Sequence, residues 1–66
     1  MSNLKRIRQE SGLSQSQLSE RSGVNIRLVQ DYEQGHKSIN NAKAITVYNL
    51  TQALGCDISE LLELDK

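Results

Sequence analysis

The sequence predicts an all-α fold, and three observations support this prediction. Apolar residues recur at helical spacing along most of the 66-residue chain. Polar capping residues precede several of these stretches, and glycines follow them. The chain has no Pro, Phe or Trp, and strand patterns are absent. At this length we expect one domain, residues 1–66, with a single small aliphatic core. Its expected members are Leu4, Ile7, Leu13, Leu18, Val24, Val29, Ile39, Val47, Leu50, Leu54, Ile58 and Leu61.

The first two helices are predicted from their ends. A first helix is expected over residues 2–11, with Gly12 at its end. Ser14 and Gln17 have the spacing of a capping box, in which each side chain satisfies an orphan backbone amide of the new helix. The second helix is therefore predicted at about residues 14–22. Gly23 ends it, because a residue without Cβ adopts the left-handed conformation at low cost.

A third helix is predicted at about residues 26–34, with Asn25 as its N-cap and Gly35 as its stop. One face of this helix carries Leu28, Val29 and Tyr32. Two capped helices with a glycine turn between them and a second glycine after them are typical of a helix-turn-helix. This motif places the N-terminal end of its second helix in the DNA major groove, so the chain is predicted to bind DNA.

The polar face of the third helix carries the candidate base contacts. Arg can bond both acceptors of guanine, Asn or Gln can pair with adenine, Asp can accept from the cytosine amino group, and Ile can touch a thymine methyl. The predicted readers are Asn25, Ile26, Arg27, Gln30 and Asp31. An alternative explanation is a solvated helix face on which Arg27 and Asp31, four residues apart, pair with each other.

Several residues together resemble the phage repressor and Cro family of regulators, often called XRE-like. They are the segment 13–19 (LSQSQLS), then Gly23, Val24, Val29, Tyr32, Glu33, Gly35, Leu50, the segment 53–55 (ALG), Leu61 and Leu62. The resemblance covers nearly the whole chain and implies a compact five-helix, lambda-repressor-like DNA-binding domain. It also implies that Gln15 holds a phosphate and that Arg8 and Glu33 form a structural ion pair between the first and third helices.

The region between Gly35 and Gly55 departs from the family pattern. It has 19 residues, about three more than usual, and lacks the usual proline, so the loop or the fourth helix is longer here. Polar and basic groups in such a loop suit phosphates, although an ordinary loop with an N-cap at Asn40 or Asn41 is an equal alternative. The predicted phosphate contacts are Gln15, Gln34, Lys37, Ser38, Asn40, Asn41 and Lys43.

The C-terminal part is predicted to form a fourth helix over about residues 41–54 and a short fifth helix that begins after Asp57. The last helix carries more apolar surface than a unit of this size buries easily, which indicates a homodimer interface; completion of the monomer core is the alternative. The predicted interface residues are Ile58, Leu61, Leu62 and Leu64. Ile45 and Tyr48 form a second candidate surface.

The charge distribution fits a DNA-binding N-terminal part. The net charge is zero, but residues 1–44 carry seven Lys or Arg and four acids, a net of +3, whereas residues 45–66 carry a net of −3. Basic residues therefore gather at the end predicted to face DNA. We expect modest affinity and a need for dimerisation, because DNA affinity depends on neutralising phosphates.

Other functions find little support in the sequence. One Cys, Cys56, one His, His36, and no phosphate-binding glycine loop leave no constellation for catalysis or a metal. We expect Cys56 to be a structural thiol in a reducing compartment and His36 to lie in a surface loop. Neither an apolar span nor a signal peptide is found, so we expect no membrane association. We also expect no cofactor and no small-molecule ligand.

The sequence thus predicts a non-enzymatic cytoplasmic transcriptional regulator. A repressor is expected, which binds double-stranded DNA at a pseudo-palindromic operator as a homodimer. The alternative is a helical protein-interaction module, or the antitoxin partner of a toxin, with Ile45, Tyr48, Ile58 and Leu64 as its contact face.

Overall fold

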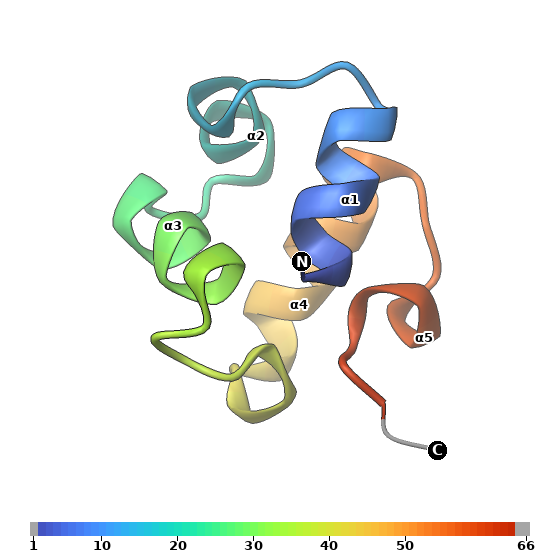
Figure 1. Cartoon of the computed structure of the whole chain (residues 1–66). Helices are drawn as coiled ribbons and strands as arrows, with labels where there is room; N and C mark the ends of the chain where they lie inside the picture. Colours follow the sequence, from blue (N-terminus) through green and yellow to red (C-terminus); the bar gives the residue numbers. More distant parts are fainter. Residues whose placement is uncertain (1, 65–66) are drawn as a thin grey trace.

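The computed structural model describes residues 2–64, and within them the chain forms five α-helices and no strand (Figure 1). This confirms the all-α, five-helix prediction. The helices are α1 (Asn3–Glu10), α2 (Gln15–Ser22), α3 (Ile26–Gln34), α4 (Ala44–Leu54) and α5 (Ile58–Leu61), and a short 3-10 helix, η1 (Ile39–Asn41), precedes α4.

Side-chain caps and glycines set the ends of α2 and α3. Ser14 Oγ accepts a hydrogen bond from the Gln17 backbone amide, and the Gln17 side chain accepts one from the Ser14 amide, so the capping box is present. Asn25 Oδ1 accepts from the Arg27 amide at 2.7 Å and caps α3. Gly23 ends α2 with a φ of 74°, in the left-handed region that favours glycine.

The helices pack around one aliphatic core. α2 contacts α3 and α4, and α1 contacts α3 and α5. In Figure 1, α2 and α3 lie side by side on one flank, α5 lies on the opposite flank, and α1 runs between them. Of the twelve residues expected in the core, Leu54 is only half-buried and Ile58 is 52% exposed. The buried apolar residues are Leu4, Ile7, Leu13, Leu18, Val24, Val29, Tyr32, Ile39, Val47, Leu50 and Leu61.

The start of the fourth helix differs from the prediction. α4 begins at Ala44 rather than near residue 41, and Lys43 occupies its N-cap position without a side-chain cap. The expectation of an N-cap at Asn40 or Asn41 is therefore wrong. Those two residues belong to η1, which ends with the Ala42 amide donating to the Ile39 carbonyl.

The additional residues of this region thus form a connection, residues 36–43, which we call the α3–α4 loop. Ser38 Oγ accepts from the Asn40 amide at 3.2 Å and caps η1. Ile39 is only 3% exposed and inserts into the core. The loop is thereby anchored in its middle, while both of its flanks remain at the surface.

The fifth helix is a single turn that completes the core. The Glu60 side chain accepts from the Asp57 amide at 2.9 Å, as the predicted capping pair requires. Leu61 is completely buried. The prediction that Leu61 belongs to a dimer interface is therefore wrong, because this side chain has no surface left to offer a partner. Ile58 and Leu64 are 52% and 61% exposed, respectively.

Candidate nucleic-acid interface

The N-terminal end of α3 presents three of the five predicted base readers to solvent. Asn25, Ile26 and Arg27 are all exposed. Within residues 2–64, the Arg27 side chain makes neither a hydrogen bond nor an ion pair, so the alternative pairing with Asp31 is not formed. The side-chain oxygen of Asn25, Oδ1, caps the helix, so the side-chain NH₂ group remains available as a donor.

The remaining two predicted readers lie further along α3 and are half-buried. Gln30 Nε2 donates to Gln15 Oε1 at 3.4 Å, which joins α3 to the start of α2. The Asp31 side chain is 19% exposed, and its Oδ1 lies 3.5 Å from His36 Nδ1. His36 itself is a surface residue of the α3–α4 loop, as expected.

A buried ion pair fixes α3 to the rest of the molecule. Arg8 Nε donates to Glu33 Oε2 at 2.6 Å, and Arg8 Nη2 donates to Glu33 Oε1 at 3.0 Å. The third Arg8 nitrogen, Nη1, donates to the Leu13 carbonyl at 2.8 Å. The pair that the family resemblance implies is thus present as a two-pronged contact, the geometry that Arg and carboxylate groups favour.

Gln15 connects this pair to the candidate base-reading residues of α3. Its Nε2 donates to Glu33 Oε1 at 3.0 Å, while its Oε1 accepts from Gln30. A chain of side chains therefore leads from Arg8 on α1, through Glu33 and Gln15, to Gln30 on the half-exposed side of α3. This chain restricts the rotamers of Gln15 and Gln30 before any ligand is bound.

The turn between α2 and α3 contains hydrogen bonds that the sequence analysis missed. Ser19 Oγ donates to the Val24 carbonyl at 2.6 Å, and the Val24 amide donates to Ser22 Oγ at 3.1 Å. These bonds satisfy both backbone groups of Val24, a residue buried in the turn. Short hydroxyl side chains in the last turn before a helix-ending glycine are the signal that would have indicated them.

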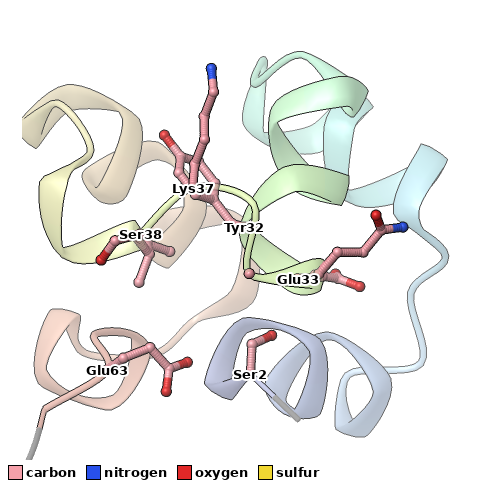
Figure 2. Close-up of a pocket in the computed structure, with 9 residues that line it drawn as sticks. Ser2, Tyr32, Glu33, Lys37, Ser38 and Glu63 are labelled. Carbon is pink, nitrogen blue, oxygen red and sulfur yellow. The ribbon is translucent and has the colours of Figure 1, made fainter.

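The predicted phosphate contacts lie mainly on the α3–α4 loop and the end of α3. Gln34 is exposed at the end of α3, and Lys37, Ser38, Asn41 and Lys43 are exposed on the loop. A shallow pocket of about 420 Å³ separates the start of this loop from Ser2 and Glu63 (Figure 2). The Lys37 side chain extends away from the pocket, on the opposite side of the loop.

The side chain of Asn40 is bonded within the molecule. Its Nδ2 donates to the Glu63 carbonyl at 2.7 Å, and its Oδ1 accepts from the Glu63 amide at 2.9 Å. Both polar atoms of the side chain are thus engaged within the molecule. In the proposal below we therefore give Asn40 a structural role and assign it no phosphate contact. No local pattern in the sequence indicates this pairing across 23 residues.

Cys56 lies half-buried after α4. Burial raises the pKa of its thiol, and the carboxylates of Glu60 and Asp57 raise this pKa further. These effects favour the neutral thiol over the nucleophilic thiolate. Residues 2–64 contain no cluster of three or more His, Cys, Asp or Glu side chains that could share a metal ion. None of the helices described is both long enough and apolar enough to span a bilayer.

Comparisons with known proteins agree with this geometry. A family model described as helix-turn-helix matches residues 4–61. The chain is also 39% identical over 61 residues to an uncharacterised HTH-type transcriptional regulator, y4dJ, of Sinorhizobium fredii (strain NBRC 101917 / NGR234). The aligned region covers 92% of this chain and 75% of that protein. No solved structure gives a significant match. The chain belongs to the XRE-like helix-turn-helix family.

Proposed function

We propose that this chain is a sequence-specific DNA-binding transcriptional regulator that inserts the N-terminal end of α3 into the major groove. The observation that carries the proposal is the state of Arg27. Its guanidinium stands exposed at the leading end of a capped helix, without an intramolecular partner within residues 2–64. An Arg in this position can bond both acceptors of a guanine without first breaking a contact of its own.

Around this contact, the proposed interface divides into base readers and phosphate contacts. Asn25, Ile26 and Arg27 form the leading part of the base-reading surface, and Gln30 and Asp31 extend it along α3. This surface depends on the orientation of α3, which is fixed by the Arg8–Glu33 pair and by the bond from Gln15 to Glu33. The proposed phosphate contacts are Gln15, Gln34, Lys37, Ser38, Asn41 and Lys43.

We further propose that the protein acts in the cytoplasm as a homodimeric repressor, without enzymatic activity. Ile58 and Leu64 supply exposed apolar surface near the C-terminal end, and Leu62 is half-buried beside them. Two copies joined through this surface would present two α3 helices to a pseudo-palindromic site with half-sites about one DNA turn apart. The repressor assignment rests on the family resemblance.

Selection of bound sequences from a random duplex library tests the proposal. A two-fold symmetric consensus is expected, and Arg27→Ala should relax the preference at one base step by about 1–3 kcal/mol. Arg21→Ala is the matched control, because Arg21 is exposed on α2 outside the proposed interface. The base preference of Arg21→Ala should equal that of the wild type. Equal consensus sequences for Arg27→Ala and the wild type would contradict the assignment of Arg27.

A second candidate function is protein binding, as an interaction module or an antitoxin. The observation that favours it is the exposure of Ile45 and Tyr48, at 60% and 56%, on the outer side of α4. These two side chains are three residues apart and therefore share one helix face, and contiguous apolar patches can mark protein contacts. In the library experiment, this function predicts no enriched sequence. It also predicts that substituting Ile45 or Tyr48 weakens binding of the protein partner more than substituting Arg27.

A further inference from the structure

The chain after α5 forms an extended segment held by two asparagines. We call residues 62–64 the strap; Leu62 has φ and ψ of −68° and 150°. The side-chain nitrogen of Asn3, Nδ2, donates to the Leu62 carbonyl at 2.8 Å. The backbone amide of Asn3 donates to Glu63 Oε2 at 2.6 Å. On its other side, the strap is bonded to Asn40. The strap thus joins the start of α1 to the α3–α4 loop.

The Asn40 contact is specific because it uses both polar atoms of one side chain. Its amide nitrogen donates to the Glu63 carbonyl and its amide oxygen accepts from the Glu63 amide, so a small hydrogen-bonded ring forms with the backbone of one residue. Only a carboxamide presents a fixed donor and acceptor side by side in this way. The backbone of Asn40 is therefore held in both position and orientation.

The start of the loop is bonded to α3, since the His36 and Lys37 backbone amides donate to the Asp31 carbonyl at 2.9 and 3.3 Å. In the middle of the loop, Ile39 is buried in the core and Ser38 caps η1, next to Asn40. Lys37 and Lys43, which flank this helix, make no side-chain hydrogen bond or ion pair within residues 2–64. Figure 2 shows Lys37 extending away from Ser2 and Glu63. The anchored side of the loop therefore faces the strap, and the basic Lys37 faces away from it.

We propose that Asn40 is a positioning residue for DNA binding, which holds the phosphate-facing loop in place through its bonds to the strap. This inference rests on the proposed function. It assigns no DNA contact to Asn40 itself. Asn3 is then a second positioning residue, which acts through the strap. It ties the strap to α1 and bonds to no residue of the loop.

The test uses two alanine variants of the full chain and two readouts. Asn40→Ala and Asn3→Ala are compared with the wild type by backbone amide hydrogen exchange, and by affinity for a short random-sequence duplex at several salt concentrations. A random duplex is suitable because phosphate contacts are independent of sequence. Gln52→Ala is the control, since Gln52 is exposed on α4 and bonded to neither the loop nor the strap.

Asn40→Ala should accelerate exchange of the Glu63 amide and of the loop amides, while the amides of Val29 and Leu50 in the core remain protected. The affinity of Asn40→Ala for the random duplex should fall by about 2- to 10-fold, the range that one or two hydrogen bonds contribute. Asn3→Ala should change both readouts in the same direction by a smaller factor. Gln52→Ala should change neither.

Two outcomes would overturn the proposal. If Asn40→Ala weakens DNA binding while loop exchange and Asn3→Ala affinity remain as in the wild type, Asn40 contacts DNA directly. If exchange rises in both variants and affinity does not change, order in the loop is irrelevant to binding. Failure of the proposed function is recognised separately, because the wild-type chain itself would then bind neither the random duplex nor any selected sequence.

Discussion

Glu33 is a carboxylate whose side chain is only 2% exposed, in a protein with a small core. It accepts two hydrogen bonds from Arg8 and one from Gln15. Burial of a charge costs several kcal/mol, and these contacts offset that cost only while both charges are present. The pair therefore contributes to the orientation of α3, and each partner depends on the other.

Glu33→Gln should destabilise the fold by about 3–5 kcal/mol, because it leaves the buried Arg8 guanidinium without a counter-charge. Urea denaturation followed by circular dichroism measures this loss. The control is Glu10→Gln, which breaks the exposed Arg6–Glu10 pair at 3.6 Å and should cost less than about 1 kcal/mol. Similar losses for both variants would mean that burial does not determine the strength of the Arg8–Glu33 pair.

Residue-scale prediction succeeded where the cause of a contact is local or repeated in a family. Asn25 as an N-cap follows from its place before a periodic segment, and the Arg8–Glu33 pair follows from the resemblance. The bonds of Asn3 and Asn40 to the strap join residues 59, 60 and 23 positions apart. Nothing in the residue types at those positions indicates such pairing before the fold is known.

At the scale of elements, the ends of α2 and α3 were predictable because each depends on two or three neighbouring residues. Gly23 is the clearest case. A Cβ built on it would meet no atom within 4 Å, so packing does not require glycine there. Glycine is required there by the φ of 74°, because this conformation is unfavourable for a residue with a side chain.

Gly23→Ala should therefore cost about 1–2 kcal/mol of folding free energy from backbone strain alone. Gly23→Asn should cost less, since Asn adopts the left-handed conformation more readily. Thermal unfolding measures both variants, with Ser16→Ala at an exposed position of α2 as the control. If the alanine and asparagine variants at residue 23 are equally stable, backbone conformation is not the cause.

The start of α4 shows where element-scale prediction fails. Its apolar periodicity fits residues from about 41 onward, but the helix begins at Ala44. The difference arises because Ile39 enters the core and Asn40 bonds to Glu63, which together impose a 3-10 helix on the preceding residues. Tertiary contacts thus override the local preference for an earlier helix start.

At the scale of the whole molecule, charge and apolar surface are distributed unevenly along the chain. The net charge of residues 1–44 is +3, and that of residues 45–66 is −3. The proposed DNA contacts lie in the first part, whereas the exposed Ile58 and Leu64 lie in the second. The proposed DNA contacts and the proposed dimer residues thus come from parts of the sequence with opposite net charge.

If the proposed homodimer forms through Ile58, Ile58→Ser should weaken it about tenfold or more without loss of helicity, because Ile58 is 52% exposed and outside the core. Sedimentation equilibrium measures the association, and circular dichroism measures helicity. Leu61→Ser, three residues later and fully buried, should instead destabilise the monomer. If Ile45→Ser reduces association and Ile58→Ser does not, the interface lies on α4.

The hydrogen bonds between Asn3 and residues 62 and 63 also bring the two ends of the described chain together. A short peptide linker between the first and last described residues would therefore close a ring with little distortion. Closing it would remove conformations from the unfolded chain while leaving the folded one nearly unchanged. The same proximity would allow the polypeptide to be circularly permuted, with new ends placed in an exposed connection elsewhere.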